Sequence, residues 1–188
     1  MEKTYISAND LLLDSYKLGI KIFDSGFKPN FIVGVWRGGT PVGIAVQEIL
    51  SYLGAPSDHI AIRTSSYTGI GEQDKKVVVH GLDYIIDHIN YDDQLLLVDD
   101  VFDSGRSIQA IFERLRKKSR RNTPKDIRIA TPWFKPNNNK TKLVPEYYLH
   151  ETDEWLVFPH ELEGLTEDEI FNNKPGVKEI LSGRNNRK

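Results

Sequence analysis

The chain has 188 residues and a mass of 21.5 kDa, with 39% hydrophobic and 28% charged residues, which suffices for one folded domain and excludes a disordered chain. Its 25 lysine and arginine residues against 27 acidic residues give a formal charge of -2, so the basic excess typical of nucleic-acid-binding proteins is missing. The absence of cysteine excludes disulfides and thiol nucleophiles. Neither a signal peptide nor a membrane-length apolar run is visible, so we expect a cytoplasmic protein that contacts neither membrane nor nucleic acid.

The chain is predicted to alternate between helices and strands. A first helix is expected to begin at Ser7 and Asp10, which have the spacing of a capping box, and to end before Gly26. Short apolar or alternating runs predict strands over residues 31–35, 61–67, 77–82, 95–98 and 127–134. Helical periodicity predicts further helices over residues 42–50 and 108–118.

This order of elements predicts an α/β fold, a mainly parallel twisted sheet flanked by helices. The sheet and its helices are expected to form a core of about residues 9–134 within a single domain. Residues 68–76 are polar and contain glycine, which predicts a mobile loop or a hairpin turn. After Lys135 the composition changes to PNNNKTK and then to aromatics and carboxylates, so we expect a small hood subdomain over the sheet's edge, comprising about residues 135–165 plus the terminal segments.

The segment LLLVDDVFDSGRS, residues 95–107, carries the most chemical information. Asp99 and Asp100 follow a predicted strand directly, at the end where open α/β sheets bind ligands, and can hold ribose hydroxyls or magnesium. Residues 103–107 then supply backbone amides, two hydroxyls and the N-terminal end of a helix, which together form a phosphate-binding cradle. Gly105 allows a phosphate to approach the backbone closely.

Two other interpretations of this segment are a serine-capped strand-to-helix turn and a phosphoaspartate receiver domain. The phosphate cradle directly after the acid pair argues against the receiver domain. The segment resembles the phosphoribosyl-pyrophosphate-binding signature of the type I phosphoribosyltransferases, in which two acids, two spacers and Asp-Thr/Ser-Gly-x-Thr/Ser follow a strand. Every position matches. The resemblance implies that Asp100, with Asp99, anchors Mg2+ and the ribose, and that Asp103 is the catalytic base. It implies binding of the phosphoribosyl group and its 5′-phosphate by Asp99, Asp100, Asp103, Ser104, Gly105, Arg106 and Ser107.

Two further segments fit the same family. Arg37, Gly38 and Gly39 follow a predicted strand, and the resemblance implies that they bind pyrophosphate; glycines expose amides to an anion and arginine offers a forked donor. Taken alone, these residues could equally form a tight turn or an RNA contact. Ser66 and Tyr67 resemble the pair that opens the flexible loop closing over the reacting centre, although an exposed aromatic at a strand end is the alternative.

The base-binding elements of hypoxanthine-guanine and xanthine-guanine phosphoribosyltransferases resemble Lys135 and the segment from Trp155 to Glu161. The resemblance implies that Lys135 donates to a 6-oxo group, Trp155 stacks on the purine, and the backbone of Leu156 reads the base edge. Glu161 is expected near the base's 2-substituent or a second metal ion, although the family commonly has aspartate there. Lys135 as a solvated loop residue and Trp155 as a core residue are the alternatives.

The expected function is therefore purine salvage: transfer of phosphoribosyl to a 6-oxopurine, with Mg2+, by a homodimer or homotetramer. The order of preference among hypoxanthine, guanine and xanthine stays open. A regulatory protein that senses phosphoribosyl pyrophosphate, or a transferase for another nucleobase, are the alternatives, and the presence of Asp103, Lys135 and Trp155 favours catalysis. The basic run at residues 114–121 is either a polyanion-binding patch or a solvated helix face, and the overall charge favours the latter.

Overall fold

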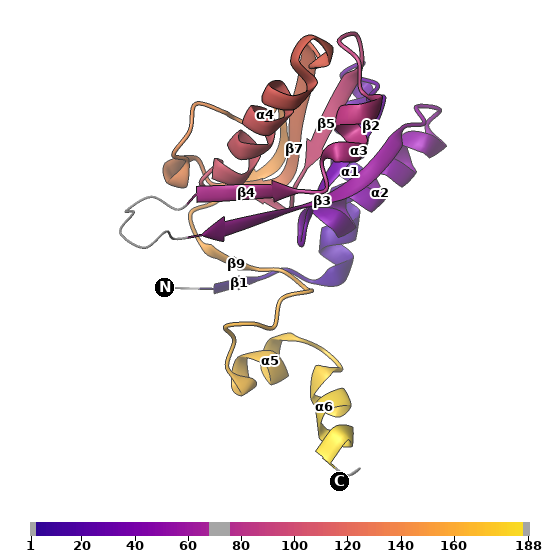
Figure 1. The fold of residues 1–188 in the computed structure, drawn as a ribbon. Coiled ribbons are helices and arrows are strands. Elements are labelled where there is room, and N and C mark those ends of the chain that lie inside the picture. Colours follow the sequence, from indigo (N-terminus) through magenta and orange to yellow (C-terminus); the bar gives the residue numbers. More distant parts are fainter. Residues whose placement is uncertain (1–2, 68–75, 186–188) are drawn as a thin grey trace. The chain divides into compact units, whose positions relative to one another are not determined.

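The computed structural model describes residues 3–67 and 76–185, which divide into two compact units. The larger unit, Leu12–Asp153, contains a seven-stranded sheet (Figure 1). Its strands are β2 (Phe31–Trp36), β3 (Asp58–Tyr67), β4 (Lys76–His80), β5 (Gln94–Val98), β6 (Val101–Phe102), β7 (Asp126–Phe134) and β8 (Tyr147–Glu151). Its helices are α1 (Ala8–Asp24, which begins in the smaller unit), α2 (Gly39–Tyr52), α3 (Asp83–His88) and α4 (Arg106–Ser119), with short 3-10 helices at Arg120–Asn122 and Pro136–Asn138.

The sheet is mainly parallel, as predicted. The strand order is β4-β3-β2-β5-β7, with β6 and β8 also paired to β7, and among the described strands of this sheet only the β3–β4 pair is antiparallel. Parallel neighbours end at the same edge of a sheet. The segments that follow β2, β5 and β7 therefore leave the sheet at one edge, and these are the segments that carry the predicted site.

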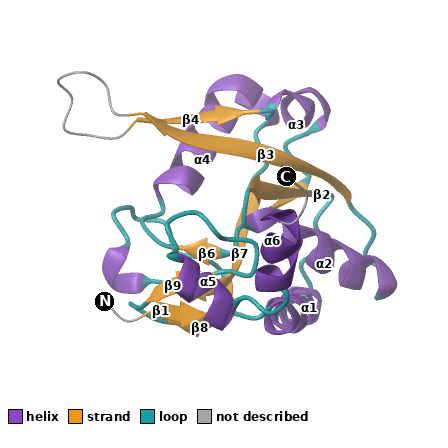
Figure 2. Ribbon diagram, turned by 90° about the horizontal axis from the view of Figure 1, so that it is seen from below, coloured by secondary structure: helices purple, strands orange, loops and turns teal. Residues whose placement is uncertain are grey.

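Helices cover both faces of the sheet (Figures 1 and 2). Alternate strand residues such as Val33, Leu95 and Leu97 are fully buried in one cluster with side chains of α3 and α4. Because side chains alternate along a strand, Ile32 and Leu96 bury on the opposite face, where α1 and α2 lie. The continuous apolar runs of the central strands thus result from burial on both faces.

The predicted elements are confirmed, with shifted boundaries. The Ser7 hydroxyl accepts the Asp10 amide at 3.0 Å, so the predicted cap begins α1. Helix α2 begins at Gly39 rather than at residue 42, since Pro41 fits the first turn of a helix, and α4 begins at Arg106 rather than at 108. Helix α3 and strands β6 and β8 were not predicted. Residues 68–75 of the predicted loop lie outside the described residues.

The smaller unit comprises Met1–Leu11 and Glu154–Lys188. Its strands β1 (Lys3–Tyr5) and β9 (Trp155–Val157) pair in parallel, and helices α5 (Glu167–Asn173) and α6 (Val177–Asn185) follow. Residues 135–153, predicted as part of the hood, belong instead to the larger unit, because β8 extends the sheet beyond β7. Within the described ranges, no helix is long and apolar enough to span a membrane.

Candidate active site

The loop after β2 lies directly against the acids after β5. A Cβ atom added to Gly38 would lie 1.6 Å from Oδ2 of Asp100, and one added to Gly39 would lie 2.4 Å from the carbonyl oxygen of Val98 and 2.7 Å from the Cα of Asp99. A side chain at Gly38 would displace the Asp100 carboxylate, and one at Gly39 would meet backbone that cannot move aside. The structure therefore brings together the predicted pyrophosphate loop and the predicted ribose and metal site.

The two acids form a strained electrostatic pair. Burial and the neighbouring charge of Asp100 raise the pKa of Asp99 well above its usual value, although the amides of Asp100 and Gly39 bond to its carboxylate and lower it in part. The Asp100 side chain is buried, and its Oδ1 accepts the amide of Val101 at 2.9 Å. Two carboxylates at such proximity favour a bound cation, because a cation relieves both desolvation and repulsion.

The cradle after β6 has the backbone that the signature predicts. Gly105 has φ +73°, and a Cβ there would lie 2.6 Å from Oγ1 of Thr141 and 2.8 Å from the ring of Phe102, so only glycine fits. Arg106 and Ser107 form the first turn of α4, whose free amides and dipole favour a phosphate. Asp103 is exposed at the start of this turn, which leaves it accessible to a substrate.

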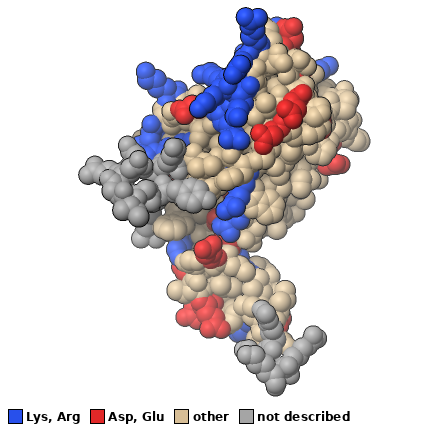
Figure 3. Space-filling model, viewed as in Figure 1, with Lys and Arg blue, Asp and Glu red and all other residues tan. Residues whose placement is uncertain are grey.

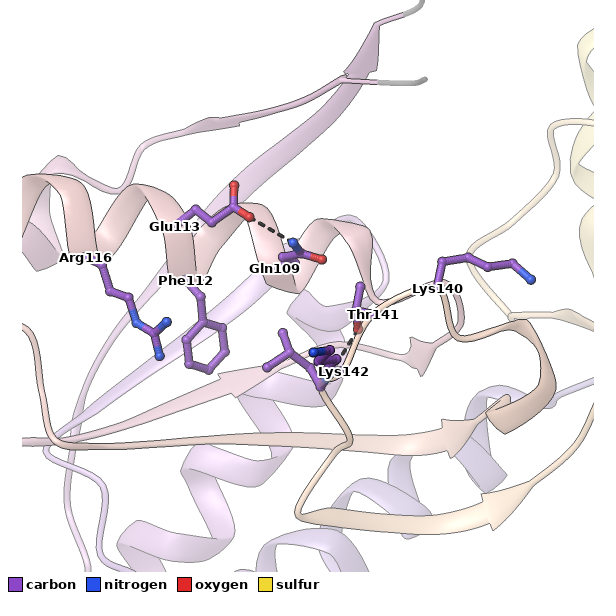
Figure 4. A pocket seen from close by; sticks show the side chains of 8 residues that line it. Gln109, Phe112, Glu113, Arg116, Lys140, Thr141 and Lys142 are labelled. Carbon is purple, nitrogen blue, oxygen red and sulfur yellow. Dashed lines mark hydrogen bonds between the residues drawn. The ribbon is translucent and has the colours of Figure 1, made fainter. Parts of the chain in front are cut away.

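A turn at residues 139–141, in the segment after β7, contacts the cradle. The Lys140 amide donates to the Ser104 carbonyl at 3.0 Å, and the Asn139 side chain accepts the Thr141 amide at 2.8 Å. Between this turn and α4 lies a hollow of about 500 Å3 (Figure 4). Figure 4 shows Phe112 and Arg116 pointing from α4 into the hollow, whereas Lys140 points away from it. The Lys140 contact thus holds the backbone of the predicted cradle at Ser104.

The basic run at residues 114–121 covers the end of α4 and the 3-10 helix after it. Figure 3 shows lysine and arginine side chains gathered over this part of the molecule. Cations at a helix C-terminus complement the negative end of the helix dipole, and Arg114 also pairs with Asp83 on α3 at 3.6 Å. These local roles account for the run without a polyanion.

Lys135 follows β7 directly and lies beside the signature. Its amide donates to the carbonyl of Phe102 at 2.9 Å, which places it next to the residue that precedes Asp103. The residue is 8% exposed, and within the described part of the chain its ammonium group makes no hydrogen bond or ion pair. The interpretation of Lys135 as a solvated loop lysine is therefore wrong.

The other predicted purine-binding residues lie in the smaller unit, on and after β9. Trp155 is 54% exposed, so it is not a core residue, whereas Leu156 is buried. Oε2 of Glu161 accepts the amide of Phe158 at 3.0 Å, and the Glu161 amide donates back to the Phe158 carbonyl at 3.0 Å. This exchange closes a tight turn just after Trp155. The roles of these residues toward base and metal stay predictions.

With this geometry in place, comparison with known proteins identifies the family. The model of the phosphoribosyl transferase domain family matches residues 7–164, which is most of the chain. The chain belongs to this family. Its strand-end acids, glycine loop and cradle thus occur together in a phosphoribosyltransferase fold, as the signature predicts. Among curated proteins, none matches the sequence significantly.

Solved structures of phosphoribosyltransferases are similar to this chain. A purine phosphoribosyltransferase from Pyrococcus horikoshii has 29% identity and a TM-score of 0.68, with coverage of 89% of this chain and 99% of the other. A Neisseria gonorrhoeae protein with bound ppGpp has 20% identity and a TM-score of 0.69, with 92% and 95% covered. A Helicobacter pylori xanthine-guanine-hypoxanthine phosphoribosyltransferase has 21% identity and a TM-score of 0.65, with 96% and 99% covered. The latter two show the shared fold.

The structure adds one residue to the predicted phosphoribosyltransferase site. Trp36 pairs in register with Arg63 of β3, and both line a polar hollow of about 520 Å3 together with Arg37. Arg63 therefore brings a second guanidinium group to the predicted pyrophosphate loop. The sequence offered one signal for Arg63, an arginine three residues before Ser66 in a predicted strand. The strand register, which the sequence does not reveal, places this arginine beside the loop that follows β2.

The pair predicted to open the flexible loop lies at the end of the same strand. Ser66 is exposed and Tyr67 is the last residue of β3. Beside them, the hydroxyl of Thr64 lies 3.5 Å from that of Ser107, which links β3 to the first turn of α4. Residues 68–75 of the loop lie outside the described residues. Its closure over the site therefore stays a prediction.

The acids after β5 fit a magnesium ion. No cluster of three or more histidine or acidic side chains that could hold a metal occurs within the described ranges. Magnesium needs no such cage, since proteins usually bind it through one or two carboxylates while substrate phosphates and water complete the octahedron. Burial first and the charge of Asp100 second raise the pKa of Asp99, so Asp99 and Asp100 are a suitable carboxylate pair for a cation.

Proposed function

We propose that this phosphoribosyltransferase transfers the 5-phosphoribosyl group from phosphoribosyl pyrophosphate to a 6-oxopurine, hypoxanthine or guanine with xanthine as a third candidate. The products are a nucleoside 5′-monophosphate and pyrophosphate. Family membership supports the reaction class, and the likeness to the purine phosphoribosyltransferase from Pyrococcus horikoshii supports a purine acceptor.

The observation that carries the choice of acceptor is Lys135, a residue only 8% exposed whose ammonium group makes no hydrogen bond or ion pair within the described residues. A cation held on a largely buried side chain is stabilised by an acceptor, so the position of Lys135 beside Asp103 favours a ligand that supplies an acceptor atom there. The 6-oxo group of hypoxanthine, guanine or xanthine is such an acceptor, whereas the 6-amino group of adenine is a donor. A site built around a buried donor rejects an analogue that cannot accept by large factors.

The reaction breaks the bond between the anomeric carbon and a pyrophosphate oxygen and forms a bond from that carbon to a purine imidazole nitrogen. The cradle at residues 103–107 holds the 5′-phosphate and thereby positions the sugar. Arg37, with the amides of Gly38 and Gly39, holds the leaving pyrophosphate, and Arg63 adds a second cation. Asp103 accepts the proton that the imidazole nitrogen loses, and its exposed position supports that role.

A magnesium ion bound at this site would supply positive charge to neutralise the leaving pyrophosphate. In this proposal Asp99 and Asp100 hold the metal and the ribose, and Glu161 contributes to a second metal or to the base. Because burial and the charge of Asp100 raise the pKa of Asp99, a cation would stabilise the ionised pair.

The proposed function is tested by an absorbance assay with magnesium and phosphoribosyl pyrophosphate, in which hypoxanthine, guanine, xanthine, adenine and uracil are offered in turn. We expect nucleotide from the 6-oxopurines and none from adenine or uracil. Turnover of uracil alone would contradict the purine assignment. Binding of phosphoribosyl pyrophosphate without turnover of any base would move the protein to the regulatory class.

We also propose a cytoplasmic homodimer or homotetramer. Exposed apolar side chains support assembly: Ile44 and Tyr52 on α2 are 60% and 85% exposed, and apolar residues at this exposure favour a protein interface. The absence of cysteine suits a reducing compartment. Light scattering after gel filtration measures the assembly, and a monomer at assay concentration would contradict it.

A further inference from the structure

The lysine at the end of α5 is buried in the smaller unit. Lys174 is 6% exposed, and its ammonium group donates to the carbonyl of Phe158 at 2.5 Å. Burial lowers its pKa, although the nearby charge of Glu161 acts in the opposite direction. A lysine kept charged at such a place needs both an acceptor and a countercharge, and here the turn from Phe158 to Glu161 provides both.

This turn directly follows the segment proposed to bind the base. The carbonyl of Phe158 accepts from two donors, the Glu161 amide and the Lys174 ammonium group, while its amide donates to the Glu161 carboxylate. Without Lys174, the Phe158 carbonyl would keep one donor and the Glu161 carboxylate would lose the nearby charge of Lys174. Hydrogen bonds inside the turn close it, and Lys174 fixes it to α5.

Glu169, a charged residue of α5 itself, contacts the other end of the segment from Trp155 to Glu161 through Lys3. Glu169 pairs with Lys3 of β1 at 2.6 Å, and the Lys3 ammonium group lies 5.8 Å from the centre of the Trp155 ring. The Lys3 contact lowers the pKa of Glu169 to about 2, and the capping contact with Thr166 adds to the effect. Glu169 of α5 thus reaches the Trp155 side of the segment, and Lys174, which directly follows α5, reaches the Glu161 side.

We propose that α5 is a positioning element for purine binding, in which Lys174 fixes the turn that carries Glu161 and Glu169 fixes Lys3 against Trp155. The inference rests on the proposed function, because it assigns Trp155 and Glu161 to the base. It gives the segment after Glu163 a role in base affinity. Neither Lys174 nor Glu169 contacts the substrate in this proposal.

The test compares Lys174→Met with Lys118→Met, a matched control near the end of α4 whose lysine is exposed and makes no hydrogen bond, ion pair or ring contact within the described ranges. In steady-state kinetics, we expect Lys174→Met to raise KM for the purine about tenfold while KM for phosphoribosyl pyrophosphate stays within about twofold. We expect Lys174→Arg, which keeps a cation and donors, to restore the purine KM to within about threefold of wild type. The control should match wild type.

An equal rise in KM for the purine and for phosphoribosyl pyrophosphate, or an unchanged KM for the purine, would overturn the inference. If Lys174→Met does not fold, Glu169→Gln takes its place and is expected to raise the purine KM about threefold. If the wild-type protein makes no nucleotide from any base, the proposed function fails and amide hydrogen exchange decides the inference separately. Phe158 and Glu161 should then exchange faster in Lys174→Met than in Lys118→Met, and equal rates would refute the role of Lys174.

Discussion

Replacing Gly38 by alanine tests the contact on which the site is built. The added Cβ would lie 1.6 Å from Oδ2 of Asp100, so this oxygen must retreat by roughly 1.8 Å to reach an ordinary contact. The atom to be moved is the end of a side chain, so the fold should survive while the carboxylate leaves its place. Since a misplacement of about 1 Å can cost about 100-fold in rate, we expect kcat/KM for phosphoribosyl pyrophosphate to fall about 100-fold, or about 2.7 kcal/mol.

Two further alanine variants make this expectation specific. At Gly39 the obstructing atoms are the Val98 carbonyl and the Asp99 Cα, which cannot rotate away, so Gly39→Ala should also lower stability, by about 1–3 kcal/mol. At Gly183 on α6 an added Cβ meets nothing within 4 Å, so Gly183→Ala should leave activity unchanged. Thermal melts and nucleotide formation measure both quantities. A folded Gly38→Ala enzyme within threefold of wild type would refute the placement of Asp100 in the site.

Three other variants test the remaining roles. Asp103→Asn should lower kcat about 100-fold or more while nucleotide affinity changes little, as for a lost general base; near-normal turnover would remove Asp103 from the chemistry. Lys135→Ala should weaken use of 6-oxopurines about 100-fold and abolish discrimination against adenine, measured as the ratio of kcat/KM values; an unchanged ratio would make the specificity assignment wrong. The folded-state pKa of Glu169 is lowered from 4.5 to about 2, so its ion pair with Lys3 stabilises above pH 4.5 and is lost as pH falls toward 2. The difference in melting temperature between wild type and Glu169→Gln should therefore shrink on acidification, and a constant difference would contradict this.

The parts of the fold predicted correctly are those whose signal is local. The strands at residues 31–35 and 95–98 are buried on both faces and have continuous apolar runs, which no solvated element could carry. The helix after the signature was recognised because Ile108, Ile111 and Leu115 share one face, and all three are buried. The signature itself is contiguous, so its geometry follows from one strand, one turn and one helix.

What could not be predicted depends on partners far away in the sequence. Strand β1 has three residues and exists through its pairing with β9, about 150 positions away, which a local pattern cannot reveal. Strand β8 has no strong apolar run that would predict it, because its pairing with β7 stabilises it. For the same reason the predicted hood began too early, since the change of composition after Lys135 marks the end of β7 and not the end of the sheet.

The features that break ordinary folding rules gather at one edge of the larger unit's sheet. Adjacent partly buried acids follow β5, a buried lysine whose ammonium group has no partner within the described residues follows β7, and a Cβ at Gly38 after β2 would displace the Asp100 carboxylate. The first two features cost stability in the free protein, and a substrate with metal-bound phosphates and a carbonyl acceptor would relieve both. Lys174 differs, because its ammonium group already has an acceptor and a nearby carboxylate. We therefore predict that the unrelieved acids and Lys135 contact the substrate, whereas Lys174, whose charge is already satisfied, acts by positioning other residues.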